Sequence, residues 1–143
     1  MEKDFNYYKV PPSFQVCFND HCPHATDCLR RQITAYIPSH LTFGPAVYPT
    51  ALGADGSCRF FRKDEKTRLA WGFNKLLYNV RERDAAGIRR SLVSYLGSRT
   101  AYYRYQHGEK LLTPEQQEWI LNFFRQRGCT DLEFEGYVTE YQF

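Results

Sequence analysis

At 143 residues the chain is long enough for one domain with a modest core, and its 43% of apolar residues excludes an intrinsically disordered protein. No stretch approaches the roughly 18 consecutive apolar residues of a membrane-spanning helix, and the sequence starts with charged residues where a secretory signal would be apolar. We therefore expect a cytoplasmic protein with no membrane partner.

The net charge of +3 conceals a strong asymmetry along the chain. Residues 1–58 carry a net charge of −1, residues 59–128 carry +8, and residues 129–143 carry −4. A basic middle segment is typical of a region that contacts a polyanion. The alternative is a set of solvated helix faces that bind nothing.

The N-terminal part of the chain has few signals of regular structure. Proline in VPPSF predicts an extended entry segment. Apolar residues at near-helical spacing predict a short helix that starts at Pro23 and stops at Pro38. Between residues 38 and 57, frequent proline and glycine predict a long loop with at most one short extended piece, near Ala46 to Tyr48.

The middle of the chain shows helical patterns instead. Apolar residues at i, i+4, i+7, i+8 and i+11 predict a helix over residues 64–79. A second apolar stripe predicts a helix that ends at Leu96, with Gly97 as its left-handed stop. The sequence TPEQ predicts a third helix, in which Thr113 is the N-cap and Gln116 completes a capping box.

Together these patterns predict a mainly α fold, namely a small helical bundle with a cysteine-tethered, loop-rich N-terminal region. In the acidic, aromatic tail, Leu132 and Phe134 alternate as in a strand, whereas Tyr137, Val138 and Tyr141 fit either a helical turn or an irregular segment, and both interpretations stay open. We expect the cysteine-rich residues 1–58 and the helical residues 59–143 to form one compact unit.

Four of the five cysteines lie in the N-terminal region, at Cys17, Cys22, Cys28 and Cys58. In a cytoplasmic protein, an uneven set of five argues against a disulfide framework and favours a metal site. Four thiolates close the tetrahedral shell of a zinc ion, so we expect a structural zinc site that tethers the long loop. Cys129 is expected to be a free thiol.

Other interpretations of these cysteines remain open. His21 and His24 flank the second cysteine and are alternative ligands. The Cys-Pro pair at residues 22–23 is typical of iron–sulfur proteins, so an iron–sulfur cluster is a second possibility. Reduced cysteines that simply pack in a core, with no metal, are the third.

Residues 82–127 combine a helix end, a glycine turn, a short basic and aromatic helix, a GE loop and a further helix. This order is formed by Leu92, Leu96, Gly97, Ser98, Thr100, Tyr103, Arg104, Gly108, Glu109, Leu112 and Pro114. The arrangement resembles the helix-turn-helix of the Cro and phage-repressor class of regulators, although the turn in LGSRTAYYR is one residue shorter. The resemblance implies a DNA-binding segment whose second helix enters the major groove.

The segment also suggests specific contacts with nucleic acid. Ser98 or Thr100 is expected to cap the second helix, and Tyr103 to lock it to the core. Tyr102 and Tyr105 are expected to stack on unpaired bases, although a tyrosine cluster between helices is also typical of core packing. The residues predicted to bind nucleic acid are Arg89, Arg90, Ser98, Arg99, Thr100, Tyr102, Arg104, Tyr105 and Lys110.

Several short stretches are characteristic of the chain as a whole. They are MEKDF at the start, the cysteine pattern of residues 17–30, CRFFR at residues 58–62, AWG at residues 70–72, YYR followed by GE, and the aromatic end. With these stretches the chain resembles a family of short bacterial proteins catalogued only as a domain of unknown function. The resemblance implies a shared architecture and no particular activity.

No residue pattern typical of an enzyme is present, because the chain lacks a phosphate-binding glycine motif, an HExxH motif and a nucleophile with a credible base. We therefore expect a small non-enzymatic protein that associates with nucleic acid, DNA rather than RNA, as transcription regulators do. The alternative is a protein-interaction adaptor of a larger machine such as polymerase or ribosome.

Overall fold

The structure is a computed structural model that describes all residues, 1–143. It contains five α-helices, three short 3-10 helices and two two-stranded sheets. The prediction of a mainly α bundle is therefore wrong, and the fold is a mixture of α and β. The chain divides into two compact units, which are Met1–Glu65 with Phe143 (unit 1) and Lys66–Gln142 (unit 2). None of the helices combines the length and the apolar character needed to cross a bilayer.

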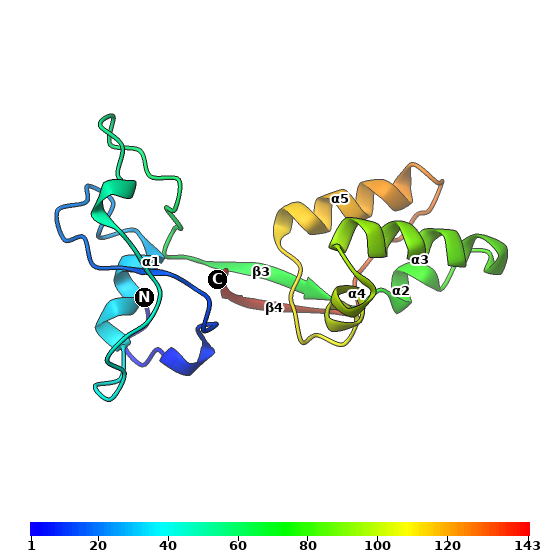
Figure 1. The fold of residues 1–143 in the computed structure, drawn as a ribbon. Helices are drawn as coiled ribbons and strands as arrows, with labels where there is room; N and C mark the ends of the chain where they lie inside the picture. The colour runs from blue at the N-terminus through cyan, green and yellow to red at the C-terminus, as the bar shows by residue number, and fades with distance from the viewer. The chain divides into compact units, whose positions relative to one another are not determined.

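Unit 1 consists mostly of loops joined by short elements (Figure 1). Its sheet is a parallel pair in which Val16 lies opposite Ala46 and Cys17 lies opposite Val47. This pair confirms the extended piece predicted inside the long loop. The elements are η1 (Tyr7–Lys9), β1 (Val16–Cys17), α1 (Leu29–Gln32), η2 (Ile33–Tyr36), β2 (Ala46–Val47) and η3 (Pro49–Ala51).

A buried arginine joins three segments in the core of unit 1. Arg30 on α1 is only 7% exposed, and its guanidinium lies 4.3 Å from the centre of the Phe14 ring. Its Nε donates to the carbonyl of Phe60 at 2.7 Å, and its Nη1 donates to the carbonyl of Gln15 at 2.6 Å. A buried charge is costly unless it is hydrogen-bonded, so losing either bond would destabilise the unit. The two bonds therefore hold the segments of Gln15 and Phe60 against α1.

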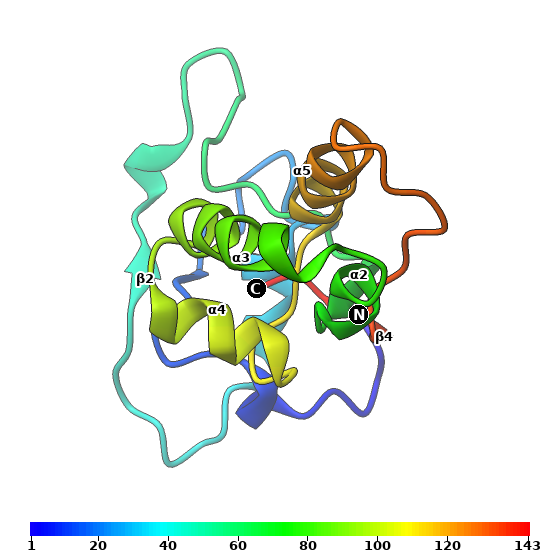
Figure 2. The same ribbon diagram turned by 90° about the vertical axis from the view of Figure 1, so that its right-hand side faces the viewer.

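Unit 2 contains an antiparallel strand pair and four helices, which gather at one end of the strands (Figure 1). Figure 2 shows α3 between α4 and α5. Buried side chains from all four helices and from β3 form its core, with Phe73, Phe124 and Phe134 among the largest. The elements are β3 (Lys66–Trp71), α2 (Asn74–Leu77), α3 (Glu82–Leu96), α4 (Arg99–Gln106), α5 (Pro114–Arg125) and β4 (Gly136–Tyr141).

The helix predicted over residues 64–79 is wrong, because Lys66–Trp71 form β3 and only Asn74–Leu77 are helical. This strand pairs with β4, with Leu69 opposite Val138 and Trp71 opposite Gly136. The acidic tail therefore supplies the partner strand from the far end of unit 2. After β3, Gly72 adopts a left-handed φ of +85°, which interrupts any helix through this position and leaves only the short α2.

The three helices after α2 confirm the local sequence signals. α3 ends at Leu96, and Gly97 follows with a φ of +101°. At the start of α5, the N–H of Gln116 donates to Oγ1 of Thr113 at 3.2 Å. The N–H of Thr113 donates in return to Oε1 of Gln116 at 3.0 Å, so the predicted capping box is present.

Gly72 is the position at which the backbone of unit 2 depends most on glycine. A Cβ at this residue would lie 2.4 Å from the Cβ of Glu135, in addition to the left-handed φ. We predict that Gly72→Ala lowers the free energy of unfolding by roughly 1–3 kcal/mol, because backbone strain and a steric clash act together. Urea-induced unfolding measures this change.

Gly87→Ala is the matched control for that substitution. Gly87 lies inside α3, where a Cβ would meet only Nη2 of Arg90 at 3.9 Å. Alanine should therefore stabilise the helix by about 0.5–1 kcal/mol. Equal effects of the two substitutions would contradict the described geometry of the turn after β3.

Candidate functional site

The segment α3–turn–α4 exposes most of the residues predicted to bind nucleic acid. Of the two predicted caps, Ser98 and Thr100, it is Ser98 that caps α4, because its hydroxyl accepts from the N–H of Ala101 at 3.0 Å. Arg104 lies 3.9 Å from Glu109, but the two side chains are 54% and 64% exposed, so solvent screens the pair. The exposed members of the predicted set are Arg89, Arg90, Ser98, Arg99, Thr100, Arg104 and Lys110.

The two tyrosines predicted to stack on bases, Tyr102 and Tyr105, are instead buried in the core of unit 2. Tyr102 stacks on Phe73 with 5.0 Å between ring centroids, and the hydroxyl of Tyr105 accepts from Nε2 of Gln116 at 3.3 Å. Tyr103, predicted to face the core, is 46% exposed. The sequence did contain a signal for this burial: Tyr102 and Tyr105 are three residues apart, so they share one helix face, whereas Tyr103 lies on another.

Unit 2 also contains a basic cleft of about 1090 Å³. Residues of α2, of the first half of α3 and of the loop after α5 line this cleft. Its acidic side chains are Asp84 and Asp131, so cations outnumber acids along the walls. The cationic side chains that line it are Lys75, Arg81, Arg83, Arg90 and Arg127.

Only one of these five cations, Lys75, has an acidic partner. Lys75 Nζ lies 3.1 Å from Oε1 of Glu133. Arg127 donates to the backbone carbonyl of Phe123 at 3.0 Å, and its guanidinium lies 3.6 Å from the centre of the Phe123 ring. No carboxylate oxygen lies within 4.0 Å of a side-chain nitrogen of Arg81, Arg83 or Arg90, so none of them forms an ion pair.

The unpaired arginines follow the geometry of α3. Arg83, Gly87 and Arg90 fall at i, i+4 and i+7, which places them on one helix face, the face that lines the cleft. Arg89 lies on the side of α3 that faces α4, close to the hydroxyl of Tyr102. Burial raises the pKa of this hydroxyl, and the positive charge of Arg89 offsets part of that rise. Cationic groups thus extend around α3 from the cleft towards α4.

Sequence reasoning missed the other walls of the cleft. Lys75 and Arg127 are far apart in the sequence, and neither belongs to the helix-turn-helix-like segment. They line the same cleft as α3 because the chain passes α2 on its way from α5 to β4. No local pattern signals that approach.

In unit 1 the structure brings the four N-terminal cysteines around one small cavity. Cys17, Cys22, Cys28 and Cys58 all line it, together with His24, and its volume is about 20 Å³. All four are free thiols. No three cysteine, histidine or acidic side chains stand in an arrangement that holds a metal ion. The structure therefore shows the grouping of the thiols and shows no metal site.

The fold and these two features define a small two-unit α/β protein with a cysteine-lined cavity in one unit and a basic cleft in the other. The chain belongs to the Family of unknown function (DUF6078), whose family model matches residues 1–143. No curated protein and no solved structure matches the chain. The resemblance to a family of unknown function is thus confirmed, and the helix-turn-helix likeness stays a prediction.

The orientation of α4 can be tested with two neighbouring tyrosines. We predict that Tyr102→Ala lowers the free energy of unfolding by roughly 3–5 kcal/mol, because it empties a buried, stacked ring position. Tyr103→Ala is the matched control and should stay within about 0.5 kcal/mol of the parent protein. Thermal and urea-induced unfolding measure both, and a larger loss for Tyr103→Ala would mean that α4 is turned differently.

Proposed function

We propose that this chain is a small non-enzymatic DNA-binding protein and that unit 2 provides the binding surface. The observation that carries the proposal is the set of unpaired arginines along the cleft, Arg81, Arg83 and Arg90. Guanidinium groups without acidic partners are free to donate charge-assisted hydrogen bonds to phosphate oxygens. Each such contact releases condensed counterions from DNA, which provides much of the affinity.

The distribution of charge between the units supports the same surface. Unit 2 contains twelve lysines and arginines against nine acidic residues, whereas unit 1 contains seven of each. The whole net charge of +3 therefore resides in unit 2. The cations belong to several elements around a cleft of about 1090 Å³, which suits an extended chain of phosphates better than one small anion.

In this proposal α4 acts as the recognition helix of a helix-turn-helix segment. A tight turn at Gly97 separates it from α3, and its exposed face carries Arg99 and Arg104. Arginine is the side chain that reads guanine most often in the major groove, through a bidentate pair of hydrogen bonds. Arg89, between the cleft and α4, would contact the phosphates between them.

The proposal assigns the cleft a binding role and no catalytic one. Its charged groups hold and position phosphates. The adaptor predicted as the alternative would bind a protein through an interface with little dependence on salt. Salt dependence therefore separates the two functions.

We predict that the full chain binds a mixed-sequence DNA duplex and that its affinity falls steeply between about 50 and 200 mM salt, as counterion release requires. Arg90→Glu should weaken binding about tenfold at low salt and reduce the salt slope by about 1 or slightly more, because one phosphate contact is lost. Fluorescence anisotropy with a labelled duplex measures both quantities.

Arg125→Glu is the matched control for this substitution. Arg125 is an exposed arginine of α5 that does not line the cleft, and its replacement by glutamate changes the net charge by the same amount as Arg90→Glu. Its affinity should stay within about twofold of the parent protein. Equal losses for both variants, or no DNA binding at low salt, would contradict the proposed surface.

The recognition role of α4 has its own test. We predict that Arg99→Ala with Arg104→Ala weakens DNA binding about tenfold or more while leaving the urea midpoint unchanged, since both side chains are exposed. Arg125→Ala on α5, outside the cleft, is the matched control and should bind DNA as the parent protein does. Full binding by the double variant would restrict the interface to the cleft and exclude α4 as a recognition helix.

A further inference from the structure

We propose that unit 1 binds one zinc ion through the thiolates of Cys17, Cys22, Cys28 and Cys58. This inference is independent of the DNA-binding proposal, because the site lies wholly in unit 1. It rests on a spatial grouping that the sequence separates widely: the first and last of these cysteines are 41 positions apart. Each sulfur comes from a different segment of the unit.

The cavity that the thiols share has the size of a single ion. Its volume is about 20 Å³, and all four cysteines of unit 1 line it. A cavity needs roughly 10–15 Å³ to hold one water molecule, so this one has room for a single small ion. Four cysteine thiols around a cavity of this size match the closed tetrahedral shell of one zinc ion.

Main-chain hydrogen bonds fix the backbone around Cys28 and Cys58. Cys28 is the residue before α1 and forms an antiparallel bridge with Lys63. The next N–H, that of Leu29, donates to the carbonyl of Arg62 at 2.6 Å. Cys58 forms a second bridge with Leu52 and so closes the tip of the long loop. The chain therefore returns to α1 at a defined position.

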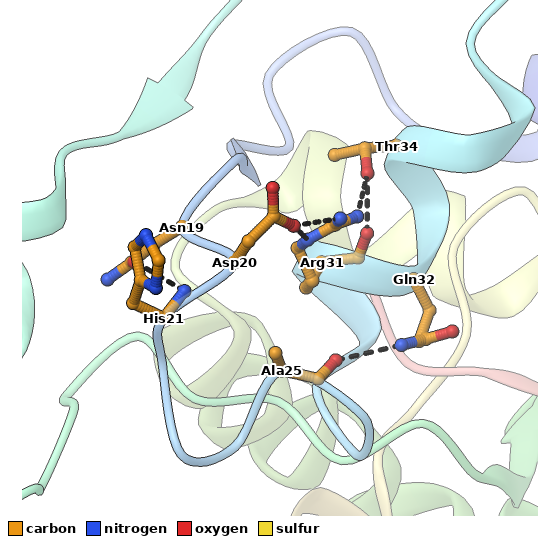
Figure 3. Close-up of polar contacts among 7 residues, drawn as sticks. All are labelled: Asn19, Asp20, His21, Ala25, Arg31, Gln32 and Thr34. Atoms are coloured by element: carbon orange, nitrogen blue, oxygen red, sulfur yellow. Dashed lines mark hydrogen bonds and ion pairs between the residues drawn. The ribbon is translucent and has the colours of Figure 1, made fainter.

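Side-chain contacts fix the loop that carries Cys22 (Figure 3). On one side of this cysteine, Asp20 accepts from Nε of Arg31 at 2.7 Å. On the other side, the carbonyl of Ala25 accepts from Nε2 of Gln32 at 2.8 Å. Both donors lie on α1, so the loop is attached to the helix before and after the thiol.

The thiols are better ligands in this site than the neighbouring histidine. Nε2 of His24 lies 2.9 Å from the carbonyl oxygen of Gly56, and its ring centroid lies 5.1 Å from that of Phe61. The imidazole therefore already has a hydrogen-bond partner and a packing surface. Four cysteines alone complete the tetrahedral shell that zinc prefers.

Charge compensation also fits a site with four thiolates. Zinc with four thiolates carries a formal charge of −2, which requires neighbouring cations. Arg30 and Arg31 line the same cavity, and Arg30 is only 7% exposed. Burial of Arg30 places its charge where the dianionic centre would need it.

Binding requires the four sulfurs to converge by side-chain rotation. Zinc–sulfur bonds are about 2.3 Å long, and in the structure the side chains around the cavity do not yet stand in that arrangement. The contacts described above hold the segments of Cys22, Cys28 and Cys58 in place, and the pairing of β1 with β2 holds that of Cys17. A metal would cross-link a unit whose helices and strands are all four residues long or shorter.

The full chain, purified without chelators, tests this proposal through its metal content. We expect one zinc per chain by elemental analysis and four cysteines protected from alkylation, with Cys129 reactive, by mass spectrometry of the native protein. Addition of Co²⁺ to the metal-free protein should give the intense bands of a tetrahedral thiolate site. These readouts on the unmodified chain do not depend on whether a variant folds.

Serine variants then assign the ligands. Cys17→Ser, Cys22→Ser, Cys28→Ser and Cys58→Ser should each lower the Zn²⁺ affinity at least tenfold, because each removes one thiolate. Cys129→Ser is the matched control and should keep one zinc per chain. Absence of bound zinc after purification and Zn²⁺ addition, an iron–sulfur absorption band, or full zinc binding by any of the four variants would overturn the proposal.

Discussion

The antiparallel pairing of β3 with β4 is the constraint on which the rest of unit 2 depends. Six register pairs join Lys66–Trp71 to Gly136–Tyr141, so the last strand has to return to the first. The chain between α5 and β4 consequently passes beside α2, where Glu133 meets Lys75. That passage forms one wall of the basic cleft, so the sheet and the candidate site have a common structural cause.

The same return brings the acidic tail against the basic part of the chain, yet it neutralises only a portion of the positive charge. Glu133 pairs with Lys75, at a surface position where an ion pair contributes little. The arginines at Arg81, Arg83 and Arg90 have no such partner. The charge that remains for a ligand is therefore concentrated along α3, which is why we assign DNA binding to this face and not to the whole unit.

How much of this was predictable depends on the range of each interaction. The capping box of Thr113 and Gln116 and the stop at Gly97 involve only neighbouring residues, so the sequence indicated α3, α4 and α5 correctly. The strand β3 was missed because its stabilising partner is distant, and an apolar pattern alone does not distinguish a buried strand from a helix. The grouping of the thiols was expected from the odd number of cysteines and their gathering in the N-terminal region, whereas the placing of Lys75 and Arg127 along one cleft depends on the path of the tail.

The central claim is that DNA lies along α3 and its cleft, and amide chemical-shift mapping tests it most directly. In an NMR titration of the full chain with a short duplex at low salt, we expect the largest shifts in residues 75–91, in residues 127–132 and on the exposed face of α4. Shifts concentrated in unit 1, shifts on the exposed face of α5, or an unchanged spectrum would contradict the account.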